Sequence, residues 1–196
     1  MKMRNLFLLF VCVAFFISCK DEESENRWTI KGVIYEKMSE NTVRVIGGDG
    51  KTAELIIPQT ITVKKDEQEV NYIVREIAPK AFSGDASIQG VYIPNSVVSI
   101  GENAFYNCYN IKIIVLGKGI KSIGTLAFNS TLFRGSVIIL ASTPPALGTD
   151  VFYLLGSEFY VPKDSYDAYT DVWNKNIYRV NILSEELMNA LREYGY

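Results

Sequence analysis

Few residues in this chain of 196 residues could perform catalysis, and histidine is absent. Without histidine there is no Ser-His or Cys-His nucleophile pair, no histidine-containing zinc site and no imidazole general base. Two carboxylates at a suitable separation could still hydrolyse a glycoside. The acidic candidates show no spacing that selects a pair: Glu102, Asp150, Glu158 and Asp164. We expect solvated loop charges, with no catalytic residue, no metal site and no cofactor.

Two other motifs invite a chemical interpretation. Cys108 has no histidine or obvious cationic cluster nearby in the sequence, so we predict a small buried residue rather than a reactive thiol. The stretch GGDGKT, residues 47–52, ends like a phosphate-binding loop. That motif needs glycine where Val45 stands and a helix after the Lys-Thr, whereas AELIIP resembles a strand. A glycine-rich hairpin turn is therefore the expected structure.

An internal repeat dominates the middle of the chain. Its three full copies, 23 residues apart, are Ile77 to Phe82, Ile100 to Phe105 and Ile123 to Phe128. A degraded copy, Leu147 to Phe152, follows 24 residues later. A second series of apolar residues, which we call the second ladder, stands seven positions before Ile100, Ile123 and Leu147. Its members are Ile93, Leu116 and Leu140, with one further member before them, Ile57, and one after them, Val161. Periods of this length are typical of solenoids, whose coils bury apolar faces against their neighbours.

The repeat residues resemble a known family. Residues 88–108 follow the pattern Ile-x-x-Val-x-Ile-Pro-x-x-Val-x-x-Ile-Gly-x-x-Ala-Phe-x-x-Cys, which is similar to the BspA-like leucine-rich repeats of bacterial surface proteins. Val70 to Val74 before the repeats and residues 160–173 after them also resemble that family. The resemblance implies a β-dominated α/β fold. We expect a right-handed solenoid of about four short coils. Gly101 and Gly124 should adopt backbone angles that are unfavourable for residues with a Cβ atom.

The flanking segments are predicted to cap the open ends of the solenoid. Residues 28–57 alternate like strands, and 61–74 should form a β-hairpin. After the repeats we expect a short helix from Pro162 through Tyr169 and a strand near Tyr178 to Ile182. Ser184 is a candidate N-cap for a final helix that ends near Glu193.

The N-terminus predicts export and lipid anchoring. Lys2 and Arg4 precede an apolar run, Leu6 to Ile17, that is too short to span a bilayer comfortably. The last two residues of this run and the two that follow it, Phe16 to Cys19, resemble the bacterial lipobox, in which Cys19 would carry the lipid. Phe16 departs from the usual leucine. The acidic residues after Lys20 resemble the surface-export signal of Bacteroidetes lipoproteins, and an ordinary cleaved secretory signal is the alternative.

These interpretations divide the chain into five parts. They are a signal peptide (1–18), a lipidated cysteine with an acidic tether (19–27), an N-terminal β cap (28–73), the leucine-rich repeats (74–162) and a C-terminal cap (163–196). Without residues 1–18 the chain keeps 18 basic and 22 acidic residues, a net charge of −4. This balance argues against nucleic acid or anionic lipid as the main partner.

Strand alternation suggests a binding surface. If the side chains of the second ladder point into the coil, the residue directly before each of them points outward. The residue two positions before that neighbour points outward as well. The apolar candidates on this face are Tyr92, Ile113, Val115, Val137, Ile139 and Tyr160. Contiguous exposed apolar surface marks a binding or oligomer contact. The alternatives are that the N-terminal strands cover this face or that the register differs by one residue.

We therefore expect a non-enzymatic binding or adhesion module that presents its repeat sheet to a protein ligand from a host or a bacterial surface. It should sit on the bacterial outer membrane, exposed at the cell surface and attached only through its lipid anchor. The alternative is a glycan-binding accessory lipoprotein. Its candidate contact residues are aromatic: Tyr92, Tyr106, Tyr109 and Tyr160.

Overall fold

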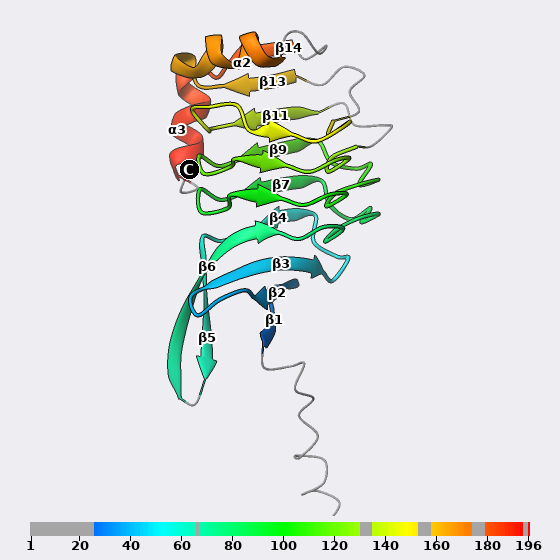
Figure 1. The fold of residues 1–196 in the computed structure, drawn as a ribbon, viewed down its shortest axis with the longest axis vertical. Coiled ribbons are helices and arrows are strands. Elements are labelled where there is room, and N and C mark those ends of the chain that lie inside the picture. The colour runs from blue at the N-terminus through cyan, green and yellow to red at the C-terminus, as the bar shows by residue number, and fades with distance from the viewer. Residues whose placement is uncertain (1–25, 66, 130–134, 153–157, 174–178, 194–195) are drawn as a thin grey trace, which may run out of the picture.

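Two β-sheets form the body of the protein (Figure 1). The computed structural model describes residues 26–65, 67–129, 135–152, 158–173, 179–193 and 196. The first sheet contains β1 (Arg27–Ile30), β2 (Val33–Lys37), β3 (Thr42–Gly48), β5 (Thr60–Lys65), β6 (Gln68–Ile77), β8 (Ser99–Ile100), β10 (Ser122–Ile123) and β12 (Ala146–Leu147). The second contains β4 (Glu54–Ile56), β7 (Gly90–Ile93), β9 (Ile113–Leu116), β11 (Ser136–Ile139), β13 (Glu158–Val161) and β14 (Arg179–Ile182).

The chain alternates between these two sheets, so each coil contributes one strand to each. The second sheet has the order β14-β13-β11-β9-β7-β4 and is parallel throughout. Strands β6, β8, β10 and β12 also pair in parallel in the first sheet, which brings equivalent residues of successive repeats side by side. This confirms the predicted β-dominated leucine-rich-repeat fold. The coil made by β3 and β4 already pairs in parallel with the first full repeat, within the segment predicted as cap.

The repeated phenylalanines form a continuous aromatic stack through the core. Ring centroids lie 5.2 Å apart for Phe82 and Phe105, 4.9 Å for Phe105 and Phe128, and 5.5 Å for Phe128 and Phe152. Interplanar angles of 11°, 4° and 5° make these rings nearly parallel. Each ring therefore fills the space between two turns of the solenoid, and the degraded fourth copy continues the same column.

The glycine of each repeat serves a close approach between coils. A Cβ atom on Gly124 would lie 2.6 Å from the backbone nitrogen of Glu102 in the preceding coil. Gly101 is similarly pressed against the backbone of Pro79. The expectation of unusual backbone angles at Gly101 and Gly124 is wrong, because neither has a positive φ. The left-handed conformation falls two residues later, at Asn103 (φ 56°) and its equivalents Lys80, Leu126 and Asp150.

Different structures close the two ends of the solenoid. At the N-terminal end, β1, β2 and β3 are antiparallel neighbours, and the β5–β6 hairpin projects beyond them (Figure 1). At the other end lie a 3-10 helix, η2 (Lys163–Ser165), α2 (Tyr166–Trp173), β14 and α3 (Glu185–Glu193). The predicted N-cap is confirmed, since the Ser184 hydroxyl accepts a hydrogen bond from the Leu187 N–H at 3.3 Å.

Candidate functional site

The outer face of the second sheet is the candidate binding surface, and strand pairing fixes which residues belong to it. One outward column contains Ile56, Tyr92, Val115, Ile138, Tyr160 and Asn181. The other contains Glu54, Gly90, Ile113, Ser136, Glu158 and Arg179. Four of the six predicted residues, Tyr92, Ile113, Val115 and Tyr160, therefore lie on this face.

The predictions for Val137 and Ile139 are wrong. Ile139, not Leu140, pairs with Leu116, so Val137 and Ile139 point inward and are fully buried in the solenoid core. The stretch Val137 to Leu140 is apolar throughout and carries no alternating signal. The spacing of 23 residues continues from Leu116 to Ile139, so the extra residue of the fourth copy falls in the turn after β11.

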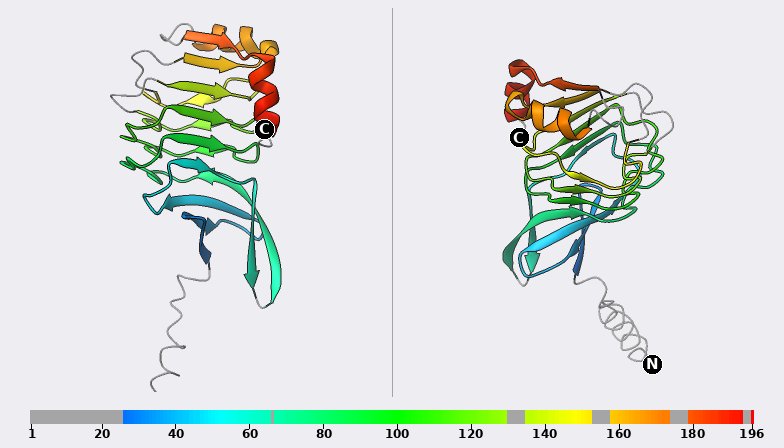
Figure 2. Two further views of the ribbon diagram at one scale, coloured as in Figure 1. Left: turned by 180° about the vertical axis from the view of Figure 1, so that it is seen from behind. Right: turned by 45° about the horizontal axis from the view of Figure 1, so that its top comes forward.

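α3 covers much of this outer face. In Figure 1 the helix runs along the stack of strands beside the second sheet, and Figure 2 shows the same arrangement from two further directions. An apolar cluster forms between the helix and the sheet, and we call it the outer cluster. Its buried members are Val115, Ile138, Leu140, Leu183 and Leu191, and its partly buried members are Tyr92, Ile113, Tyr160, Leu187, Met188 and Tyr196.

The outer cluster explains why Val115 is outward yet fully buried. Of the two alternatives considered from sequence, the register differs by one residue only in β11, and the covering element is the C-terminal helix rather than the N-terminal strands. The helix leaves the β4 end of the face open. Ile56 is 57% exposed there, beside half-buried Tyr92, and the side chain of Glu54 lies over Gly90.

Tyrosine phenols border the outer cluster at both ends. At the β13 end, the Tyr160 hydroxyl donates a hydrogen bond to Glu158 Oε2 at 2.5 Å, and this bond raises the pKa of Tyr160. The other oxygen of that carboxylate lies 3.9 Å from Arg179 Nη1. At the β7 end, burial raises the pKa of the Tyr196 phenol, and the nearby Tyr92 adds to the effect. The Tyr160 and Tyr196 phenols are therefore neutral near pH 7, so this part of the face offers hydroxyl groups and aromatic surface.

The four tyrosines considered for glycan binding do not share one surface. Tyr92 and Tyr160 lie on the second sheet under the edge of α3. Tyr106 and the 49% exposed Tyr109 lie on the turn that leads from β8 to β9. The structure thus divides these side chains between two separate regions.

The catalytic candidates are dispersed as well. Glu102 and Asp150 lie on turns two coils apart, Glu158 lies on β13, and Asp164 lies in η2. Cys108 is buried as predicted, and its thiol donates a hydrogen bond to the Phe82 carbonyl at 2.9 Å. Burial raises the pKa of this thiol to about 12, which keeps it protonated. Among the described residues, no group of three or more acidic, cysteine or histidine side chains could hold a metal ion.

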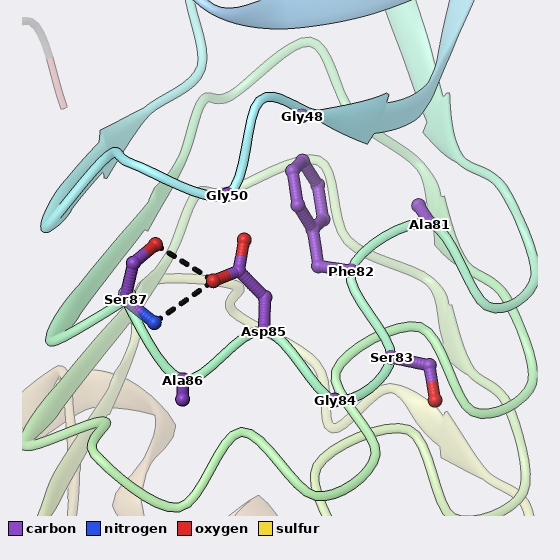
Figure 3. A pocket seen from close by; sticks show the side chains of 9 residues that line it. All are labelled: Gly48, Gly50, Ala81, Phe82, Ser83, Gly84, Asp85, Ala86 and Ser87. Carbon is purple, nitrogen blue, oxygen red and sulfur yellow. Dashed lines mark hydrogen bonds between the residues drawn. The ribbon is translucent and has the colours of Figure 1, made fainter.

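The stretch GGDGKT is not a phosphate-binding loop, but the predicted hairpin turn is wrong as well, because it joins β3 in the first sheet to β4 in the second and these two strands do not pair. β3 ends at Gly48, and Asp49 Oδ1 accepts a hydrogen bond from the Lys51 N–H at 3.0 Å before strand β4 begins. This turn borders a shallow hollow of about 430 Å³ (Figure 3). The lining residues are Gly48, Gly50 and 81–87. The hollow's carboxylate is already engaged, because Asp85 Oδ1 accepts hydrogen bonds from the Ser87 N–H at 2.9 Å and hydroxyl at 2.6 Å.

Comparison with known proteins agrees with this geometry. A family model described as the BspA type leucine rich repeat region matches residues 68–157 in six copies. Residues 68–157 belong to the BspA-type leucine-rich-repeat family. The match covers the strands from β6 to β12, whose parallel pairing and phenylalanine stack are those described above. No curated protein matches the chain.

Several solved structures resemble this protein. A leucine-rich repeat protein from Bacteroides capillosus is 24% identical, with a TM-score of 0.56, over 68% of this chain and 99% of that one. A leucine-rich repeat protein from Bacteroides ovatus is 25% identical, with a TM-score of 0.55, over 82% of this chain and 38% of that one. A leucine rich cell surface protein from Faecalibacterium prausnitzii is 22% identical, with a TM-score of 0.50, over 70% of this chain and 37% of that one.

The predicted lipid attachment residue, Cys19, and the signal peptide before it lie outside the described residues. Within the residues that the structure describes, no helix is long and apolar enough to cross a membrane.

Proposed function

We propose that this protein is a non-enzymatic cell-surface binding module that presents the outer face of its second sheet to a protein ligand. Its repeat fold suggests a protein-interaction or adhesion module. The observation that carries the proposal is the open β4 end of this face. There Ile56 is 57% exposed next to half-buried Tyr92, outside the area that α3 covers. Exposed apolar side chains that adjoin an aromatic residue are typical of binding surfaces.

The proposed location is the bacterial outer membrane, with Cys19 as the lipid-bearing residue and the folded domain outside the cell. The lipobox-like residues at 16–19 support this location, as does the description of the Faecalibacterium relative as a cell surface protein. Replacement of Cys19 by serine should release the protein from the membrane fraction. Retention of the Cys19→Ser variant in that fraction would contradict the lipid anchor.

A paired substitution tests the ligand surface. The protein and its variants are immobilised and exposed to solubilised surface proteins, and the captured proteins are identified by mass spectrometry. We expect Ile56→Asp to lose at least about tenfold of the specific capture, because a charge replaces apolar contact area at the open end of the face. The matched control is Val172→Asp, since Val172 is 55% exposed but lies on α2.

The two variants must first show the same unfolding midpoint as the native chain. Equal capture by Ile56→Asp and Val172→Asp would exclude this surface as the ligand site. Specific binding to a defined oligosaccharide on a glycan array, with no protein captured, would replace the proposed function with glycan binding.

A further inference from the structure

α3 differs from the rest of the C-terminal cap in how it joins the body. α2 inserts Tyr169 and Trp173 into the solenoid core, where both are at most 2% exposed and the Tyr169 hydroxyl donates a hydrogen bond to the Ala141 carbonyl at 3.0 Å. The apolar side chains of α3 belong instead to the outer cluster, on the other side of the sheet. The described core of the solenoid is therefore complete without α3.

The connection between β14 and α3 consists of two residues, Leu183 and Ser184. Leu183 is anchored to the sheet, because its N–H donates a hydrogen bond to the Val161 carbonyl at 2.8 Å. At the next residue, Ser184, both the hydroxyl and the carbonyl accept hydrogen bonds from α3 itself. A change in the backbone angles near Ser184 would move α3 away from the sheet as a unit, since hinge motions are absorbed by a few residues at element ends.

The outer face is longer than α3. Its six strands span five spacings of about 4.8 Å, or about 24 Å, which a helix of about 16 residues would cover. α3 has 9 residues and is therefore about 13.5 Å long. The difference appears at the β4 end, where Ile56 stays exposed. A longer amphipathic helix that lay in the same place would bury Ile56 in addition to the outer cluster.

We propose that the outer face of the second sheet is a helix-binding groove, occupied in cis by α3 and taken over by an amphipathic helix of a partner protein. The inference rests on the proposed function, because it names the partner and the regulation of the same face. The partner helix carries apolar residues at the spacing of Leu187, Met188 and Leu191, and continues over Ile56. That additional contact favours the partner over α3, as displacement requires a difference in affinity between the two states.

The test uses the full chain and a labelled peptide. Leu187→Asp combined with Leu191→Asp should expel α3 from the groove. A fluorescent peptide with the native sequence of residues 184–196, titrated by anisotropy, should then bind at least about tenfold more tightly than it binds the native chain, in which tethered α3 competes at high effective concentration. The control chain carries Asn189→Asp and Ala190→Asp, which add the same charge at exposed positions and should exclude the peptide as the native chain does.

Near-ultraviolet circular dichroism and urea unfolding accompany the titration. A folded Leu187/Leu191 variant that does not bind the peptide would overturn the proposal. So would loss of the folded solenoid, because α3 would then be part of the structural core. Dimerisation of the variant in light scattering, in place of peptide binding, would assign the face to a second copy of the chain and overturn the partner helix.

This assay is separable from the test of the proposed function. The titration uses purified protein and one peptide, so its failure leaves the capture result with Ile56→Asp intact. Conversely, peptide binding together with no specific capture of surface proteins would support the helix-binding groove and contradict the proposed protein ligand.

Discussion

Truncation of a ring in the middle of the aromatic stack should strongly destabilise the protein. Phe105 is 1% exposed and lies between Phe82 and Phe128, with centroid distances of 5.2 Å and 4.9 Å. Removal of a buried phenylalanine ring typically costs about 3–5 kcal/mol. Phe105→Ala also breaks two ring contacts, each worth about 0.5–1.5 kcal/mol beyond area burial. We therefore expect a decrease in the free energy of unfolding near the upper end, about 4–5 kcal/mol.

Urea unfolding followed by circular dichroism measures this loss. The matched control is Tyr109→Ala, because Tyr109 belongs to the same turn but is 49% exposed, and its truncation should change stability by less than about 0.5 kcal/mol. A lower slope with urea in the Phe105 variant would mean that the two ends of the solenoid unfold separately. A loss below about 2 kcal/mol, or one equal to that of Tyr109→Ala, would refute the stacked core.

Three further predictions concern two backbone positions and the carboxylate of Glu36, which pairs with two arginines. Gly124→Ala should cost about 1–3 kcal/mol, because its Cβ would lie 2.6 Å from backbone of the preceding coil. Gly47→Ala should cost less, because Gly47 has no positive φ and the added Cβ would lie 3.3 Å from its nearest neighbour, the Ala81 carbonyl oxygen. Thermal unfolding compares the two variants, and equal losses would contradict the close approach. Leu126→Asn should raise the unfolding temperature by relieving the left-handed backbone at φ 57°, and Leu126→Val should lower it; the reverse order would contradict the strain. Hydrogen bonds from Arg44 and Arg27 lower the pKa of Glu36. The ionised Glu36 side chain therefore stabilises the fold above about pH 4.3, and this contribution is lost as the pH falls through its lowered pKa in the folded protein. Urea unfolding measures the difference in the free energy of unfolding between the native chain and Glu36→Gln. This difference should shrink below about pH 4. A difference that is constant from pH 7 to pH 3 would exclude this linkage.

The repeat could be predicted because each coil solves the same local packing problem. Ile100, Ala104 and Phe105 recur at a fixed interval, and the structure stacks them with their equivalents in parallel strands. The final helix could also be predicted, since the Ser184 N-cap is a local signal. The role of the repeat glycine could not, because the nearby atoms belong to a coil that is 23 residues away in sequence.

The register of β11 shows where pattern reasoning fails. Residues 137–140 are all apolar, so either alternate set could face inward, and only hydrogen bonding to β9 selects Val137 and Ile139. The structure buries both sets. One set packs in the solenoid core and the other, which includes Ile138, packs under α3, and the absence of alternation follows from that double burial.

The sequence by itself determined the repeat, the ladder of phenylalanines and the helix that ends the chain, because these depend on local spacing and capping signals. Only the tertiary structure decided what the outer face contacts. The apolar side of α3, with Leu187, Met188 and Leu191, shows that the helix needs an apolar surface, but hydrophobic contact has no direction and does not name the surface. The fold brings the end of the chain back over β9 and β11, and so leaves Ile56 open while Val115 is covered.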